Sequence, residues 1–234
     1  MSREYCKNCK KALKGCICEY VVPTSNENHI TILRHHSEVK SIKGTALLLS
    51  LSLSNITLLD GEEFSAKDVI KDDMDNYLLF PSENALSIDG EQFSKGHDVK
   101  ARSNFIFLDG TWKKAYKILQ ENPFLKELTH FFLEVQGRSS YSQVRKQKPG
   151  GVSTLEAVVL TLKKIEGETK FKELESSFEE FIKNLKRLNS MKLPKNTFLS
   201  ILVLSLLLVL PSFGQEISSI LNFMNNSSTS FMLN

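Results

Sequence analysis

Four cysteines near the amino terminus form the first group of residues that could bind a ligand. Cys6, Cys9, Cys16 and Cys18 are the only cysteines among 234 residues, with the spacing C-x2-C-x6-C-x-C. Four thiolates are the ligand set of a closed, tetrahedral zinc site, which is structural and not catalytic. Four free thiols or two disulfides are the alternatives, and the C-x-x-C half-site in a cytosolic redox environment favours zinc. The spacing therefore predicts a zinc-binding segment over residues 1–25.

A second group lies where an apolar strand turns into a helix. The run 105–108 has the composition of a strand buried on both faces, and Asp109-Gly110-Thr111-Trp112 follows it directly. Asp109 offers a carboxyl group that could accept a proton, or that could simply cap the following helix. Trp112 is the only tryptophan. It is either a core anchor or a surface on which a base or an adenine ring stacks.

The third group is a long basic loop. Residues 135–155 contain no acidic residue and are rich in glycine, hydroxyl groups and cations. This composition suits contacts with the phosphates and backbone of a nucleic acid, although a solvated basic loop has the same composition. The residues predicted to contact RNA are Arg138, Arg145, Lys146 and Lys148.

Alternating strands and helices must position these groups. The sequence predicts strands at 29–33, 56–59, 77–80, 105–108 and 131–135, and helices at 44–53, 111–120, 153–165 and 170–189. The alternation indicates an α/β fold with a largely parallel sheet. Ligands of such sheets bind at the carboxyl ends of strands. We therefore expect segments 78–81, 108–112 and 134–156 to share one rim.

Two residue pairs have structural explanations. Ser153-x-x-Glu156 matches the capping box of a helix start, which is compatible with a ligand at the same helix end. His35 and Glu38, just past the first strand, could form a histidine–carboxylate pair.

Segment 191–234 has a different character. Met191, Lys192 and Lys195 precede an apolar run at 198–210, which is the layout of a secretory signal peptide. The run is shorter than the roughly 20 residues that span a bilayer. Either the start of a downstream exported protein is joined to this reading frame, which we favour, or the tail is a weak membrane anchor. We expect the α/β catalytic domain to occupy 26–190 and the tail to lie outside it.

The overall charge limits the classes of partner. The formal net charge is only +3, so attraction to a nucleic acid must come from local patches and not from the whole molecule. No protein partner is evident from the sequence, and we expect a cytoplasmic protein.

Several blocks of the chain, taken together and in order, resemble the DTW-domain family over about residues 3–165. They are the four-cysteine start, His35-x-x-Glu38 with Thr45-Ala46, Leu78-Leu79-Phe80-Pro81, Asp109-Gly110-Thr111-Trp112, Ser139 to Lys146, and Ser153 to Ala157.

The resemblance implies a tRNA-uridine aminocarboxypropyltransferase. Such an enzyme transfers the 3-amino-3-carboxypropyl group of S-adenosylmethionine to N3 of a tRNA uridine and releases methylthioadenosine. The resemblance also implies a parallel sheet related to that of the knotted methyltransferases called SPOUT. An RNA methyltransferase of the same fold and a non-catalytic, zinc-bearing RNA-binding module are the alternatives.

The resemblance also assigns residues to roles. Asp109, Thr111 and Trp112 are expected to be catalytic, with Asp109 accepting the N3 proton or orienting the uracil ring. The residues expected to bind S-adenosylmethionine are Leu79, Phe80, Pro81, Leu108, Asp109, Ser140, Tyr141, Ser153 and Thr154.

Overall fold

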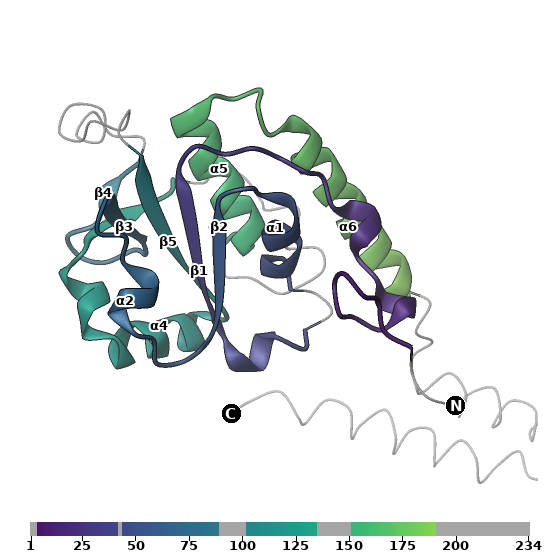
Figure 1. The fold of residues 1–234 in the computed structure, drawn as a ribbon, viewed down its shortest axis with the longest axis horizontal. Helices are drawn as coiled ribbons and strands as arrows, with labels where there is room; N and C mark the ends of the chain where they lie inside the picture. Colours follow the sequence, from purple (N-terminus) through teal and green to yellow (C-terminus); the bar gives the residue numbers. More distant parts are fainter. Residues whose placement is uncertain (1–3, 42–43, 89–101, 135–150, 191–234) are drawn as a thin grey trace, which may run out of the picture. The chain divides into compact units, whose positions relative to one another are not determined.

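The computed structural model describes residues 4–41, 44–88, 102–134 and 151–190 (Figure 1). The chain divides into two compact units, Met1–Arg187 and Leu188–Asn234. The predicted signal-peptide-like segment 191–234 lies outside the described residues. Among the helices that the structure describes, none is long and apolar enough to cross a membrane.

A parallel sheet of six strands forms the centre of the first unit. The strands lie in the order β2-β1-β5-β3-β6-β4, and each neighbouring pair is parallel. Their bounds are β1 (His29–His35), β2 (Ile56–Gly61), β3 (Asp75–Leu79), β4 (Leu86–Ser87), β5 (Ser103–Asp109) and β6 (Thr129–Phe132). The parallel α/β prediction is confirmed. Strand β4 escapes sequence analysis because its two residues are too few to show a periodic pattern.

Helices lie on both sides of the sheet. In Figure 1, α1 (Ala46–Ser52) and α5 (Thr154–Glu166) lie on one side with α6 (Lys172–Ser190) outside them, and α2 (Ala66–Val69) and α4 (Trp112–Glu121) lie on the other. Short 3-10 helices span Leu13–Gly15, Cys18–Tyr20, His36–Glu38 and Pro123–Glu127. Of these helices, the sequence predicts α1, α4, α5 and α6. It does not predict α2, which is a single turn of four residues.

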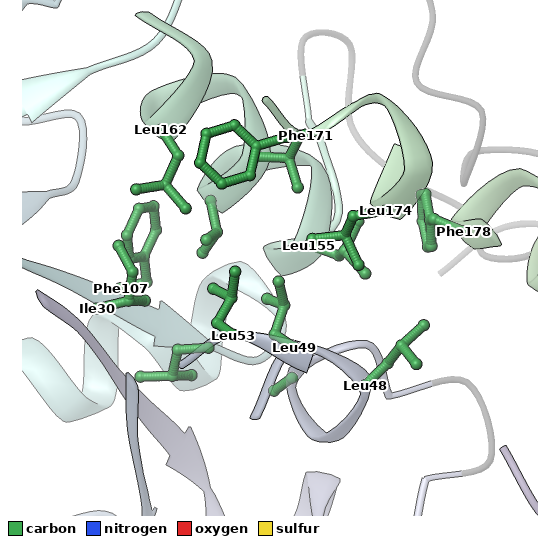
Figure 2. Packing of buried hydrophobic residues seen from close by; sticks show 14 of the residues in the cluster. Ile30, Leu48, Leu49, Leu53, Phe107, Leu155, Leu162, Phe171, Leu174 and Phe178 are labelled. Carbon is green, nitrogen blue, oxygen red and sulfur yellow. The ribbon is translucent and has the colours of Figure 1, made fainter. Parts of the chain in front are cut away.

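The strands divide their side chains between two hydrophobic cores, because alternate residues of a strand point to opposite faces. Phe105 and Phe107 of β5 enter the core beneath α1, α5 and α6, whereas Ile106 enters the core beneath α2 and α4. Figure 2 shows the larger core, in which Leu49, Leu53, Leu155, Leu162 and Phe171 gather over Ile30 and Phe107. Burial on both faces explains the continuous apolar run of this strand.

A buried asparagine joins the three central strands. Asn104 of β5 is fully buried, and its Oδ1 accepts a hydrogen bond of 2.8 Å from the Thr31 hydroxyl of β1. Its amide group donates to Asn76 Oδ1 of β3 at 2.8 Å and to the Val69 carbonyl at the end of α2 at 2.9 Å. Asn104 therefore satisfies buried polar groups from three neighbouring elements.

We predict that Asn104→Ala lowers the free energy of unfolding by about 3 kcal/mol, because it leaves buried hydrogen-bonding groups without a partner. Urea denaturation of the full chain measures the loss. Asn184→Ala is the control, since Asn184 is half-buried and donates one hydrogen bond, to the Tyr20 hydroxyl, so it should cost about 1 kcal/mol or less. Equal losses in the two variants would contradict this account.

Candidate functional site

A pocket of about 320 Å³ opens at the carboxyl ends of β3, β5 and β6. Helices α4 and α5 both begin at this pocket, although they lie on opposite sides of the sheet. Such a crevice, where helices leave for opposite sides of the sheet, is where parallel α/β sheets bind their ligands. The lining residues are Leu79, Phe80, Pro81, Phe107, Leu108, Gly110, Trp112, Ala115, Phe131, Phe132, Leu133, Gly151, Val152, Ser153, Thr154 and Ala157.

Aromatic rings form much of the pocket wall. The Trp112 ring meets Phe80 edge to face, with the ring centroids 5.9 Å apart. Trp112 is 44% exposed, so it is not a core anchor. A large aromatic surface that remains open at a pocket mouth suits stacking against a flat ring. The structure therefore favours the second of the two interpretations of this tryptophan.

Asp109 lies behind the pocket wall and not on it. It is the last residue of β5, it is buried, and its Oδ1 accepts a hydrogen bond of 2.5 Å from the hydroxyl of Thr154, which does line the pocket. The interpretation of Asp109 as the N-cap residue is wrong, because the N-cap of α4 is Thr111, whose side chain makes no capping hydrogen bond. The Asp109 carboxyl group instead joins the end of β5 to the start of α5.

A tight turn follows Asp109. A Cβ atom on Gly110 would lie 2.9 Å from Cβ of Lys114 and 3.6 Å from Cβ of His35. The first distance is too short for any side chain, so only glycine lets the strand end approach α4 this closely. Thr111 is exposed and does not line the pocket.

The start of α5 is firmly capped. Ser153 Oγ accepts from the Glu156 backbone N–H at 3.2 Å, and Glu156 Oε2 accepts from the Ser153 backbone N–H at 2.7 Å. The predicted capping box is thus confirmed. The hydroxyl of Thr45, just before α1, accepts a further bond of 3.3 Å from the Leu155 N–H.

His35 and Glu38 do not pair with each other as the sequence suggested. His35 Nε2 lies 2.6 Å from Glu62 Oε1 at the end of β2, and Glu38 Oε1 accepts from Lys114 Nζ of α4 at 2.8 Å. Glu62 was not foreseen, because its proximity to His35 depends on the parallel alignment of β1 with β2. The two pairs connect the end of β1 and the residues that follow it to other segments beside the pocket.

The hydrogen bonds of His35 indicate its tautomer. Its Nδ1 accepts from the Ser37 backbone N–H at 3.2 Å, so the ring proton lies on Nε2 and is donated to Glu62. Burial lowers the pKa of His35. The hydrogen bond from Lys117 is the main cause that lowers the pKa of Glu62. The cluster therefore holds a neutral imidazole beside an ionised carboxylate near neutral pH.

The four cysteines come together as predicted. The Sγ atoms of Cys6 and Cys18 lie 3.6 Å apart, those of Cys9 and Cys16 lie 3.7 Å apart, and all four lie within 4.8 Å of one another. A tetrahedron of sulfurs about 2.3 Å from a central metal has edges of about 3.8 Å, so the cluster could hold a metal ion such as zinc. Backbone N–H groups of Cys9 and Asn8 lower the pKa of the Cys6 thiol to about 6, which favours a thiolate at Cys6. The Cys6 side chain in turn raises the pKa of Cys16 to about 12, so the metal itself would have to displace the proton of that thiol.

The cysteine segment is attached to α6. The Tyr20 ring packs on Phe181 with centroids 5.4 Å apart, and the Tyr20 carbonyl accepts from the Ser177 hydroxyl at 2.7 Å. Cys9 and Ile17 are buried in the same core as these residues. The segment is therefore continuous with the main core and is not a free appendage.

Comparison with known proteins identifies the family. The DTW domain family matches residues 3–186, which is most of the chain. The chain belongs to the DTW-domain family. Over 174 residues it is 29% identical to the protein named tRNA-uridine aminocarboxypropyltransferase 2 of Drosophila melanogaster, a span of 70% of this chain and 67% of that protein. No solved structure matches.

Most of the described residues that were predicted to bind S-adenosylmethionine line the pocket. Of the residues predicted to bind S-adenosylmethionine, those that line it are Leu79, Phe80, Pro81, Leu108, Ser153 and Thr154, and the predicted catalytic residue Trp112 lines it with them. Asp109 contacts it through Thr154. Outside the described residues lie Arg138, Ser140, Tyr141, Arg145, Lys146 and Lys148.

Sequence analysis missed several lining residues of the DTW-domain pocket. Phe107 could have been found, because it lies two residues before Asp109 and points to the α5 side of the sheet. Ala157 could also have been found, because it lies four residues after Ser153 on a predicted helix. Phe131 and Phe132 gave no such signal, because their place depends on which strand pairs with β3.

We predict that removing bound metal loosens α6 as well as the cysteine segment, although none of the four cysteines lies in α6. The reason is that Tyr20 and Ile17 depend on the cluster for their position against α6. Hydrogen exchange before and after chelation should show loss of protection over 172–187, with β5 as the internal reference. Unchanged protection of α6 after verified metal loss would contradict the prediction.

We also predict that stability falls as the pH is lowered from 7 to 5. Because burial lowers the pKa of His35 below its ordinary 6.5, the unfolded chain takes up a proton in this range before the folded chain does. His35→Gln should therefore make the unfolding free energy less dependent on pH. His29, whose pKa burial also lowers, should account for a remaining slope. Urea denaturation at several pH values tests this, and an unchanged slope in His35→Gln would count against it.

Proposed function

We propose that this DTW-domain protein transfers the 3-amino-3-carboxypropyl group of S-adenosylmethionine to N3 of a tRNA uridine. The observation that carries the proposal is the pocket, because it gathers residues predicted to bind the donor from three separate parts of a DTW-domain chain. The name of the Drosophila relative gives the same reaction class.

The pocket has the properties that such a donor site needs. Its volume of about 320 Å³ falls within the usual range for small-molecule sites. Phe80 and Trp112 offer aromatic surface to a flat ring, while the start of α5 offers the positive end of a helix to an anionic group such as a carboxylate. We place S-adenosylmethionine here, with its aminocarboxypropyl end toward Ser153 and Thr154.

The choice of the transferred group is a question of position. The sulfonium of S-adenosylmethionine has three electrophilic carbons, and the carbon held in line with the nucleophile, about 3–3.5 Å away, is the one attacked. Uracil N3 forms a bond to that carbon as its bond to sulfur breaks, and methylthioadenosine leaves. The rigid start of α5 would hold the longer chain in place for this attack.

Uracil N3 must also lose its proton, and Asp109 is the proposed acceptor. Because Asp109 reaches the pocket through the Thr154 hydroxyl, we propose that the proton passes by way of Thr154. The Thr154 oxygen takes the N3 proton as its own proton moves to Asp109 Oδ1. Such positioned proton transfer typically contributes 10²–10⁴-fold to a rate.

Other parts of the chain complete the proposal. Zinc on the four cysteines would be structural, since four thiolates leave no open position for chemistry. Arg138, Arg145, Lys146 and Lys148 are proposed to bind tRNA phosphates, with Ser140 and Tyr141 beside the donor. We also propose that the chain forms a SPOUT-type knot. Segment 135–150 lies outside the described residues.

The test combines nucleoside analysis with two substitutions at the proposed proton path. Purified full-length protein, tRNA and S-adenosylmethionine should yield a uridine that carries an aminocarboxypropyl group, detected by mass spectrometry. Asp109→Asn and Thr154→Val should each lower the rate about 10²–10⁴-fold, whereas Thr154→Ser should stay within about tenfold of wild type. Calorimetry of S-adenosylmethionine binding should separate lost chemistry from lost donor affinity.

Each other result has a defined meaning. A gain of a methyl group would make the protein a methyltransferase, and tRNA binding with no modification would make it an RNA-binding module. A full rate in Thr154→Val with an inactive Asp109→Asn would remove Thr154 from the proton path.

A further inference from the structure

We infer that the exposed side of α4 is a second nucleotide subsite, in which the base next to the modified uridine stacks on Tyr116. The inference rests on the proposed function, because it assumes that the uridine itself enters the neighbouring pocket. It adds a binding residue outside the pocket and outside the DTW signature.

The first observation is exposure. Among the described residues, the large hydrophobic side chains left exposed are Tyr5, Leu13, Val39, Trp112 and Tyr116. Two of them, Trp112 and Tyr116, lie on α4, and Tyr116 is the more exposed of the two at 57%. They are four residues apart, so their side chains are neighbours on one side of the helix, about 6 Å apart along its axis.

The orientation of α4 holds these rings outward. Ala115, Ile118 and Leu119 are buried in the core beneath the helix, and Ala115 also lines the pocket. Tyr116 could turn inward only if these residues left the core. The aromatic side of α4 is therefore a fixed surface that begins at Trp112, in the pocket wall, and continues to Tyr116.

The charges on this surface favour a nucleic acid. Residues 112–120 include three lysines and no acidic residue. Lys114 and Lys117 form ion pairs with Glu38 and Glu62, whereas Lys113 is exposed and, within the described part of the chain, no carboxylate is recorded against it. An aromatic ring beside an available cation can stack a base and attract the phosphate of the same nucleotide.

The surroundings fit a nucleotide better than a protein partner. The other exposed residues of this side of α4 are Lys113, Lys117 and Gln120, so the two rings have a polar border and do not belong to a broad apolar patch. Protein interfaces of useful affinity have a larger apolar centre. Single bases, in contrast, bind to isolated rings, and each stacked base contributes a separate amount to affinity.

The distance between Trp112 and Tyr116 also fits an RNA strand in which one base has left the stack. When a base leaves the stack to enter a pocket, its neighbour lies farther away than the roughly 3.4 Å of stacked bases. The 6 Å offset from Trp112 to Tyr116 matches such an unstacked neighbour. With S-adenosylmethionine in the pocket, the modified base would enter at its mouth beside Trp112, and Tyr116 would hold the next base.

Short single-stranded oligouridine RNA is the probe for this subsite, with the full-length protein and fluorescence anisotropy as the readout. Tyr116→Ala should weaken binding at least fivefold, and up to about 100-fold if the stack is strong. Tyr116→Phe should stay within twofold of wild type, because the ring is kept. Tyr5→Ala is the matched control, since Tyr5 is a similarly exposed tyrosine on the cysteine segment, and it should also stay within twofold.

A second readout follows the pocket directly. Trp112 is the only tryptophan, so its fluorescence reports binding at the pocket mouth without a label. In Tyr116→Ala, half-maximal quenching of Trp112 should require a higher oligouridine concentration. The increase should equal the factor by which the affinity measured by anisotropy falls. A circular dichroism melt identical to wild type would show that the variant is folded.

The outcomes separate this inference from the proposed function. Equal RNA affinity in wild type and folded Tyr116→Ala overturns the subsite, even if tRNA is modified normally. RNA affinity that depends on Tyr116, in a protein that transfers no aminocarboxypropyl group, supports the subsite and overturns the proposed function. Self-association that depends on Tyr116, with no RNA affinity, overturns the inference in favour of a protein interface.

Discussion

The parallel alignment of β5 between β1 and β3 is the constraint on which the rest of the structure depends. Strand β5 is hydrogen-bonded along both edges and buried on both faces, so it cannot shift without disturbing both hydrophobic cores. The alignment sets Leu108 beside Leu33 and Phe107 beside Leu79. The carboxyl ends of these strands therefore lie level, and the residues that follow them meet at one rim.

Hydrogen bonds and ion pairs between separate segments turn this rim into a defined pocket. Asp109 joins the end of β5 to α5, and Glu38 joins the loop after β1 to α4. Thr45 adds an acceptor for the start of α5. These contacts join residues from separate parts of the chain to the first turns of α4 and α5, beside the same pocket.

The cysteine cluster has a different task from the pocket. No residue of segment 4–25 lines the pocket, and the segment acts on the fold through Tyr20, Ile17 and the inner side of α6. Helix α6 in turn buries Phe178 and Phe181 in the larger core. A metal on the four sulfurs would therefore stabilise the layer outside α1 and α5, and the chemistry would belong to the strand ends.

Local sequence was sufficient wherever short-range physics decides the outcome. The apolar runs of β1 and β5, the three- and four-residue spacing of Phe171, Leu174 and Phe178, and the Ser153–Glu156 capping box each depend on residues close in the chain, and each was predicted correctly. Strand order, the His35–Glu62 pair and the position of Asp109 behind Thr154 could not be read in this way. They join residues 26 and more positions apart, and only packing of the whole sheet determines which distant side chains become neighbours.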